Sequence, residues 1–561
     1  MKKYNNDKNF VYSIVAAISF VILLTFHYLS NLRLIFDGWQ YFFGVCAVIS
    51  CFFFVHFAIK NSKQNKEQKT KKIKNIRTPF IISAIILSIC YIVFVGMSKY
   101  YYCFGKVDAE QIYYHMFVGS DKMDMSTVYL IALPCILLGT IATVTIFYIL
   151  NSVYKKVQLN EKKKSGIPMV CSLVSIILTF TYILYLIPII PFVYNQNCSN
   201  SNFIEQNYID PLYTEIEFPE EKRNLIYIYM ESMENTFSDF ENGGAFENNL
   251  IPEITQLQKE NFSFSNTDKF GGALSTYGMT YTTAGIFAQS FGLPLKIGNK
   301  INGKATKILS EFYNIYDVLS DAGYSEYVIM GSSSKFGGLK ELFDSHGSTK
   351  VLDYQYMTES GFVDENYRVF WGVEDEKVYE LSKEKISEIS KNKEPFFFTI
   401  ETVDTHCPNG YVCNLCKNTY QDDYSNVINC ASKQVNDFIK WAEEQEWYEN
   451  TTIVIVGDHC SMKTDFFADI DKNYVRTTTN IFINVDPSIA KETVKLKNRQ
   501  FFSADMFPTT LASIGCKIDG NRLGVGTNLF SDRATLYEEF GYEFVNNEFK
   551  KKSTLYETVF S

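Results

Sequence analysis

The sequence has no excess of positive charge, no internal repeat and no glycine-rich nucleotide loop of the GxGxxG or Walker type. Its 53 Lys and Arg residues are outnumbered by 62 Asp and Glu residues, which gives a formal net charge of −9. This balance argues against a nucleic-acid-binding protein, and no loop supports a nucleotide site. Intrinsic disorder is also excluded, because 47% of the residues are hydrophobic and 16% are aromatic, and such composition drives folding.

Apolar residues are unevenly distributed along the 561 residues, which are too many for one compact domain. Five stretches before residue 193 are apolar and long enough to cross a membrane as helices, which takes about 20 residues. These stretches are 10–29, 39–60, 79–99, 128–150 and 168–192. Core helices of a soluble protein are the alternative, disfavoured because the stretches lack polar faces. A cleaved signal peptide would explain only the first stretch.

We therefore predict a five-helix transmembrane domain at 1–192 and a polar, Asn-rich connector at 193–222. A second folded domain at 223–535 and a C-terminal tail at 536–561 complete the expected organisation.

Basic residues mark alternate loops between these stretches. They precede the first stretch (Lys2, Lys3, Lys8) and cluster at 63–77 and 155–164, whereas the other two loops have fewer, partly mixed with acidic residues. Loops rich in Lys and Arg stay in the cytoplasm. Five spans from a cytoplasmic N-terminus place the chain after about residue 193 outside the cytoplasm.

Seven of the 13 cysteines follow residue 193, and four of these seven lie between Cys407 and Cys430. Disulfides persist outside the cytoplasm, so we interpret this cluster mainly as a disulfide-linked loop. Zinc binding by Cys413 and Cys416 is the alternative, but Cys407 and Cys430 have poor spacing for a second ligand pair. Seven is an odd number, so at least one thiol has no partner within the chain.

Short unbroken apolar runs alternate with helical patterns after the connector. The runs are 224–230, 327–330, 395–400, 451–457 and 480–485, and the helical patterns include 306–322, 374–391 and 431–445. Unbroken apolar strands are typical of a sheet that is buried on both faces. We predict an α/β doubly wound domain with a parallel sheet, in which ligands gather at the carboxyl ends of the strands.

Polar residues follow three of these runs. Glu231 ends the first, Glu401, Asp404 and His406 follow the third, and Asp458-His459 ends the fourth. Glu231, Asp458 and His459 form a mixed oxygen and nitrogen set that suits Mn²⁺, Zn²⁺ or Mg²⁺.

Thr282 is the candidate nucleophile, because it follows a glycine-containing loop and begins a helical pattern. The exposed N–H groups of a helix N-terminus stabilise a phosphate or an oxyanion, and a bound metal activates a hydroxyl. An ordinary N-cap is an equally good interpretation of Thr282 alone. Only its combination with the three metal-ligand candidates favours catalysis.

Four segments together resemble the sulfatase-like phosphoglycerol transferases, which include the lipoteichoic acid synthases and the enzyme that decorates periplasmic glucans. These segments are 224–234, 282–295, 402–410 and 456–459, and the resemblance extends over roughly 222–530. It implies an alkaline-phosphatase/sulfatase-like fold for an extracytoplasmic catalytic domain at 223–535. Together with the basic loops, it implies a bacterial inner-membrane protein whose catalytic domain faces the periplasm or the cell exterior.

The resemblance also implies a site and a reaction. Glu231, Thr282, Asp458 and His459 match the ligands of one divalent metal, Mn²⁺ first, with Zn²⁺ or Mg²⁺ as alternatives. Thr282 matches the nucleophile, which would take glycerol phosphate from phosphatidylglycerol, release diacylglycerol, and pass the group to a glycan or glycolipid acceptor. His406 matches a residue near the transferred group.

The chain departs from the lipoteichoic acid synthases in the loop after residue 330, where their His, Asp, Trp and Arg are missing. Lys335 in this loop is a candidate phosphate contact. The continuation at 340–347, together with Cys416 and Cys430, looks closer to the periplasmic-glucan branch, so we expect glycan decoration and a Cys416–Cys430 disulfide.

Three other functions were weighed. A true sulfatase is disfavoured because Thr282-Thr-Ala-Gly does not match the Cys/Ser-x-Pro-x-Arg pattern. A phosphoethanolamine transferase shares the spans, the metal and the threonine, but typically has Gly-Glu-Thr-x-Arg where this chain has Met230-Glu231-Ser232-Met233. A non-catalytic membrane sensor or scaffold would keep the fold without needing Thr282.

Overall fold

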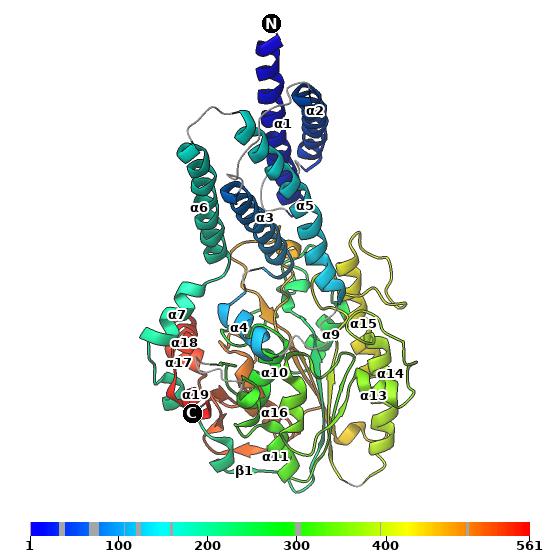
Figure 1. Cartoon of the computed structure of the whole chain (residues 1–561). Helices are drawn as coiled ribbons and strands as arrows, with labels where there is room; N and C mark the ends of the chain where they lie inside the picture. The colour runs from blue at the N-terminus through cyan, green and yellow to red at the C-terminus, as the bar shows by residue number, and fades with distance from the viewer. Residues whose placement is uncertain are drawn as a thin grey trace. The chain divides into compact units, whose positions relative to one another are not determined.

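The computed structural model describes residues 2–32, 40–66, 78–105, 107–118, 125–156, 161–297, 305–392, 394–489 and 493–560. The chain forms two compact units, and Figure 1 follows it from the N-terminus to the C-terminus. The first unit comprises Met1–Lys106 and Met125–Pro188, and the second comprises Val107–Asp124 and Ile189–Ser561. The second unit therefore contains a piece of chain that the expected boundary at residue 192 assigned to the membrane domain.

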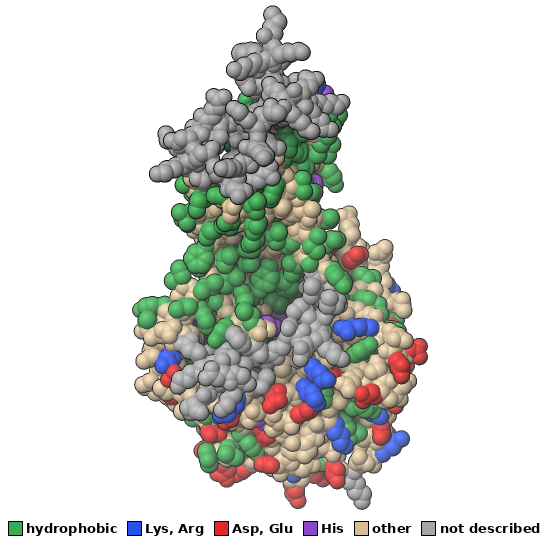
Figure 2. Space-filling model, viewed as in Figure 1, with side chains coloured by type: hydrophobic (Ala, Val, Ile, Leu, Met, Phe, Trp, Pro, Cys, Tyr) green, Lys and Arg blue, Asp and Glu red, His purple; other side chains and the backbone are tan. Residues whose placement is uncertain are grey.

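The first unit contains five long apolar helices. They are α1 (Lys2–Asn31), α2 (Gln40–Lys66), α3 (Thr78–Phe104), α5 (Met125–Lys156) and α6 (Glu161–Leu186). Each contains a window that is long and apolar enough to cross a membrane, with mean hydropathy between 2.2 and 2.5. Hydrophobic side chains dominate the described surface of these helices in Figure 2. The expected number and positions of the spans are confirmed by length and composition.

A six-stranded mixed sheet lies at the centre of the second unit, with strand order β5-β4-β6-β2-β7-β9. The strands are β2 (Asn224–Met230), β4 (Ser325–Met330), β5 (Lys350–Leu352), β6 (Phe396–Glu401), β7 (Thr451–Gly457) and β9 (Asn480–Ile483). The first five run parallel, whereas β9 pairs antiparallel with β7, with Ile453 opposite Ile483. All five predicted runs are strands, but the sheet is not wholly parallel, because its edge strand β9 runs the other way.

Side chains of β2 alternate between two hydrophobic cores. Leu225, Tyr227 and Tyr229 pack in one core, while Ile226 and Ile228 pack in the other. Successive residues of a strand point to opposite faces, so an apolar residue is needed at every position of a strand covered on both sides. This requirement explains why the strands appear in the sequence as unbroken apolar runs.

Helices cover both faces of the sheet (Figure 1). The core of Leu225 includes residues of α10 (Thr282–Phe291), α11 (Ile315–Asp321), α12 (Leu339–Asp344) and α16 (Met506–Ser513). The core of Ile226 includes residues of α9 (Pro252–Glu260), α13 (Tyr354–Glu359), α14 (Asp375–Ile389) and α15 (Asp423–Glu443).

Two of the expected helices differ from the structure, whereas the expected helix at 374–391 is observed as α14. The pattern at 306–322 divides into a 3-10 helix, η3 (Ala305–Ser310), and α11, which begins after the N-cap Asn314. The pattern at 431–445 is the second half of α15, which begins after the N-cap Asp422. In both cases a side-chain cap fixes the helix start, because its oxygen accepts hydrogen bonds from otherwise unpaired N–H groups.

The residues expected as connector and tail are folded in the second unit. They include α7 (Ile189–Cys198), α8 (Phe203–Asn207), α17 (Leu536–Phe540), α18 (Tyr542–Lys550) and α19 (Thr554–Phe560). Phe203 of α8 and Val545 and Tyr556 of the C-terminal helices are buried in the core of Leu225. The described part of the second unit also contains six two-residue strands, which pair in three short sheets. These pairs are β1 (Ile216–Glu217) with β10 (Lys517–Ile518), β3 (Ala273–Leu274) with β8 (Thr477–Thr478), and β11 (Arg522–Leu523) with β12 (Gly526–Thr527).

Candidate active site

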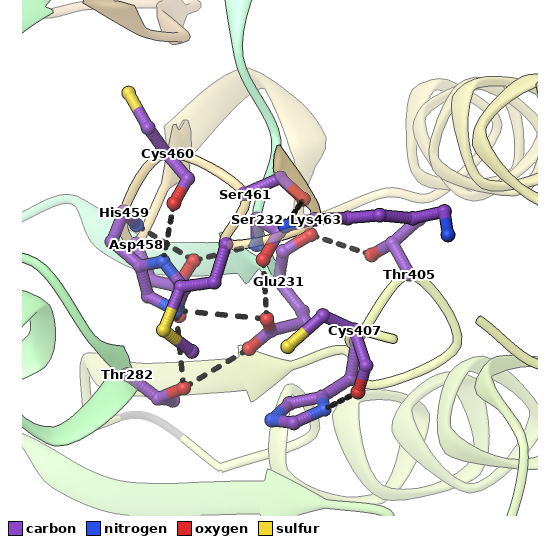
Figure 3. Close-up of polar contacts among 12 residues, drawn as sticks. Glu231, Ser232, Thr282, Thr405, Cys407, Asp458, His459, Cys460, Ser461 and Lys463 are labelled. Atoms are coloured by element: carbon purple, nitrogen blue, oxygen red, sulfur yellow. Dashed lines mark hydrogen bonds and ion pairs between the residues drawn. The ribbon is translucent and has the colours of Figure 1, made fainter. Parts of the chain in front are cut away.

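The carboxyl ends of β2 and β7 carry a compact polar cluster. Glu231 directly follows β2, and Asp458 and His459 directly follow β7. These strands are parallel neighbours, with Met230 opposite Gly457, so the three side chains emerge at one edge of the sheet, as the sequence predicts. Figure 3 shows them converging with Thr282 around a common point.

Four side chains offer their polar atoms to this point. Thr282 Oγ1 lies 3.1 Å from Glu231 Oε2 and 3.4 Å from His459 Nε2. His459 Nε2 lies 3.6 Å from Glu231 Oε1 and 3.4 Å from Asp458 Oδ2. Glu231, Asp458 and His459 are all buried, at 3%, 1% and 1% exposure. The four predicted metal and nucleophile residues are therefore brought together.

The donor set fits a divalent cation. Asp458 Oδ1 accepts hydrogen bonds from the backbone N–H groups of Ser232 and His459, but its Oδ2 is buried with no hydrogen-bond partner among the described residues. A buried carboxylate oxygen without a partner is costly, and a metal ion at the cluster would satisfy it. Two carboxylates, one imidazole and one hydroxyl suit Mn²⁺, Zn²⁺ or Mg²⁺.

The histidines present the correct nitrogen to the site. His459 Nδ1 lies 2.9 Å from the carbonyl oxygen of Cys460, and His406 Nδ1 lies 2.6 Å from that of Cys407. A carbonyl oxygen only accepts, so each Nδ1 carries the proton and donates it. Nε2 of the neutral ring then keeps its lone pair, which is the form that binds a metal or accepts a proton.

Without a cation, the carboxyl groups of Glu231 and Asp458 oppose each other's ionisation. Burial raises the pKa of Asp458 well above its ordinary range, and the charge of Glu231 adds to this shift. Burial also raises the pKa of Glu231, but the positive charge that His406 and His459 carry when protonated, together with the hydrogen bond from the Ser232 hydroxyl, outweighs burial and holds that pKa below its ordinary value. One ionised carboxylate therefore opposes the ionisation of the other. A bound cation would stabilise both ionised forms.

Thr282 is the first residue of α10, and it is half-buried although every other residue of this helix is buried. A close approach to β7 sets its position. A Cβ at Gly285 would lie 2.2 Å from the carbonyl oxygen of Asp458, and Gln289 Nε2 donates to the Gly457 carbonyl at 3.2 Å. Only glycine permits this contact, so the segment Thr282-Thr-Ala-Gly is fitted to the end of β7.

His406 lies beside aromatic side chains. Its ring centroid is 4.7 Å from that of Trp371, which is in turn 5.0 Å from that of Phe336. Lys335 directly precedes Phe336, and its side chain is exposed. Thr283 Oγ1 donates to the carbonyl oxygen of Gly337 at 3.0 Å, so the loop that carries Lys335 adjoins the start of α10.

The place of α4 (Ala109–Val118) in this unit is not predicted from the sequence. Tyr114 is fully buried and donates to the Gly337 carbonyl at 2.8 Å, and the ring of His115 lies 5.2 Å from that of Tyr281. Burial lowers the pKa of His115. The signal in the sequence was a helical segment containing a histidine in an otherwise short loop between two apolar stretches.

Three of the clustered cysteines also come together. Cys413 Sγ lies 3.6 Å from Cys416 Sγ and 3.7 Å from Cys430 Sγ, and no disulfide joins any two of these three cysteines in this structure. The expected Cys416–Cys430 pair thus lies within a group of three.

Comparison with known proteins gives one family and several curated relatives. The family model for Sulfatase matches residues 223–516. Phosphoglycerol transferase I from Escherichia coli strain 55989 is 30% identical over 330 residues, which are 56% of this chain and 40% of that protein. The chain therefore spans well under half the length of this relative.

Two solved structures are similar over the same region. A protein of the alkaline phosphatase superfamily from Vibrio parahaemolyticus has a TM-score of 0.45 and 20% identity, covering 59% of this chain and 76% of that one. The lipoteichoic acid synthase LtaP from Listeria monocytogenes has a TM-score of 0.44 and 16% identity, covering 57% and 79%. The family match covers more than half of the 561 residues, and it includes Glu231, Thr282, Asp458 and His459, so this chain belongs to the Sulfatase family.

Proposed function

We propose that the protein transfers glycerol phosphate from phosphatidylglycerol to a glycan or glycolipid acceptor outside the cytoplasmic membrane. The curated relative named phosphoglycerol transferase I supports the group that is transferred. The five apolar helices support a lipid donor held at the membrane, and the basic loops support an outward-facing catalytic unit. The reaction depends on one divalent metal, for which Mn²⁺ is our first choice.

One observation carries the proposal. The Thr282 hydroxyl stands half-exposed at the N-terminus of α10 and within 3.4 Å of both Glu231 and His459. A threonine that served only as a cap would not need two buried metal-ligand candidates beside its hydroxyl. A nucleophile needs both access to substrate and a group that activates it.

The residues take the following roles. Glu231, Asp458 and His459 hold the metal, which when bound supplies charge to activate the hydroxyl and to stabilise the phosphoryl oxygens. Glu231 Oε2 accepts the hydrogen bond of the Thr282 hydroxyl and is placed to receive its proton. The first N–H groups of α10 have no partner within the helix, so they point at the phosphate that Thr282 attacks.

The transfer takes two steps. Thr282 Oγ1 forms a bond to phosphorus, the bond from phosphorus to the diacylglycerol oxygen breaks, and diacylglycerol leaves with a proton. An acceptor hydroxyl then attacks the phosphorus, and the Thr282 oxygen leaves and regains its proton. His406 and Lys335, which border the loop beside α10, bind the glycerol phosphate.

The experiment uses the full chain in liposomes of phosphatidylglycerol labelled in its headgroup, with Mn²⁺ and candidate glycans. We expect release of diacylglycerol and label on the glycan. Thr282→Ala should lower turnover at least about 1000-fold, as removal of a nucleophile does, and mass spectrometry should find glycerol phosphate on the wild-type peptide that contains Thr282.

Thr358→Ala is the matched control, because the hydroxyl of this threonine on α13 donates to the carbonyl oxygens of Tyr354 and Gln355 in its own helix. Its turnover should equal that of the wild type. Undiminished turnover in the Thr282 variant would refute the mechanism. Label transfer from phosphatidylethanolamine liposomes instead would assign the chain to phosphoethanolamine transfer.

A further inference from the structure

Three cysteine thiols converge away from the candidate active site. Cys413 and Cys416 lie in the loop between β6 and α15, and Cys430 lies on α15. Their sulfur atoms all lie within 4.8 Å of one another, and Cys413 and Cys430 are buried. One loop and one helix thus direct three sulfurs to a single point.

The separations of these sulfurs match a shared metal ion. Zinc binds thiolate sulfur at about 2.3 Å in a tetrahedron, which puts the sulfurs about 3.8 Å apart. The observed separations from Cys413 are 3.6 Å to Cys416 and 3.7 Å to Cys430. A disulfide bond needs about 2.05 Å between two sulfurs, and it would leave the third thiol beside it without a role.

Gln434 supplies a fourth polar group. It lies one helical turn after Cys430 on α15, is 7% exposed, and its amide lies 3.5 Å from Cys430 Sγ and 3.9 Å from Cys413 Sγ. Its Oε1 is buried, and no residue in the described ranges forms a hydrogen bond with it. The oxygen and nitrogen of an amide exchange places by a half turn. When one zinc ion binds an oxygen and a sulfur in a tetrahedron, these two atoms lie about 3.6 Å apart. The separations of 3.5 and 3.9 Å between the Gln434 amide and the two sulfurs are close to this value, so its Oε1, turned towards the thiols, is placed to share the ion.

We propose that Cys413, Cys416, Cys430 and the amide oxygen of Gln434 bind one structural zinc ion, separate from the metal of the candidate active site. The ion holds the loop after β6 against α15. This loop also contains His406, whose carbonyl oxygen accepts from Gly410 N–H at 3.0 Å, and Asp404, whose carbonyl oxygen accepts from Tyr411 N–H at 2.7 Å. The zinc therefore stabilises the loop that presents His406.

The test measures metal binding by the full chain in detergent, purified without chelators or oxidants. Elemental analysis should find zinc in the purified chain, and a thiol-blocking mercurial should release about one equivalent to a zinc-sensitive dye. Cobalt in place of zinc should give the near-ultraviolet charge-transfer absorption of thiolate-bound Co²⁺. The oxygen and nitrogen ligands of the candidate active site give no such absorption, so the two sites are distinguished.

Variants locate the ion. Cys413→Ser and Cys430→Ser should lose the cobalt absorption and the equivalent released by mercurial, whereas Asp458→Asn should keep both. Cys198→Ser is the matched control, since Cys198 is exposed on α7, and it should also keep both. Gln434→Ala should weaken zinc binding about 10-fold or more, and Gln434→Glu should retain it.

Two results would overturn the proposal. Peptide mapping without reductant could find Cys413 or Cys416 joined to another cysteine of the cluster in the freshly purified chain. Alternatively, wild-type protein could show neither zinc release by mercurial nor the thiolate absorption with cobalt. Both measurements use the wild-type chain, so they decide the question even where a cysteine variant does not fold. Neither depends on transferase activity.

Discussion

The ion pair between Arg476 and Glu234 joins the two loops that carry the candidate metal ligands. Glu234 lies three residues after Glu231, and its side chain is completely buried. Arg476 Nε donates to Glu234 Oε2 at 2.7 Å, and its Nη2 donates to Glu234 Oε1 and, at 2.6 Å, to the carbonyl oxygen of Ser461. We predict that Arg476→Met destabilises the second unit and weakens binding of the catalytic metal.

The loss of stability depends on the hydrogen bonds that the Glu234 carboxylate retains in the Arg476 variant. Removal of one partner from a buried ion pair costs about 3–5 kcal/mol, because the other charge stays buried. Here Ser461 N–H at 3.0 Å and the Thr236 hydroxyl at 2.6 Å still donate to the carboxylate, so we expect the lower end, about 3 kcal/mol. Ser461 lies two residues after His459, so metal affinity should fall about 10- to 100-fold, as it does when outer contacts of a ligand are lost.

Urea unfolding followed by tryptophan fluorescence measures the free energy, because Trp371, Trp441 and Trp447 all lie in the second unit. Calorimetric titration of the full chain with Mn²⁺ measures the affinity. The double variant Glu234→Gln/Arg476→Met should recover about 1–2 kcal/mol relative to Arg476→Met, because no buried charge is left unpaired.

Lys517→Met is the control for loss of an ion pair. The side chains of Lys517 and Glu217 are 84% and 58% exposed and 3.3 Å apart, so their pair should contribute less than about 1 kcal/mol. If the Arg476 and Lys517 variants lose the same free energy of unfolding, burial of Glu234 does not determine how much stability the loss of its ion pair costs. Unchanged Mn²⁺ affinity in the Arg476 variant would show that the ion pair does not position the ligands.

Three further predictions concern other contacts of the second unit. Gly285→Ala should lower turnover and thermal stability together, because its Cβ would lie 2.2 Å from the Asp458 carbonyl oxygen, and wild-type values for both would contradict the close approach. Tyr114→Phe should cost about 1 kcal/mol in urea unfolding, since the Gly337 carbonyl keeps the Thr283 hydroxyl as a donor; a cost above about 3 kcal/mol would contradict this reasoning. Burial raises the pKa of Glu326 to about 8, so the folded state holds a proton that the unfolded state loses above its ordinary pKa, and stability should fall from about pH 5 to about pH 8. Glu326→Gln should reduce that fall, and an identical pH profile of the variant would refute the assignment.

The strands were predictable because a strand that is buried on both faces needs an apolar residue at every position. Every position of Thr451–Gly457 is buried, and the residues that follow, Asp458 and His459, contrast with it. The helices were less predictable. The start of α15 at Asp423 was missed although Asp422 is an N-cap whose carboxylate accepts from Ser425 N–H at 2.8 Å. Such a cap is a local contact that hydrophobic periodicity does not report.

The amino-acid order alone was sufficient for the spans, the strands and the ligand candidates at the strand ends, since these depend on properties that repeat or change along the chain. The packing of distant segments decided the rest. It placed His115 of α4 near His406, brought Cys413, Cys416 and Cys430 to one point, and set Thr282 beside Glu231. These contacts join residues far apart in the chain, and no periodicity or neighbouring residue specifies which distant surfaces will meet.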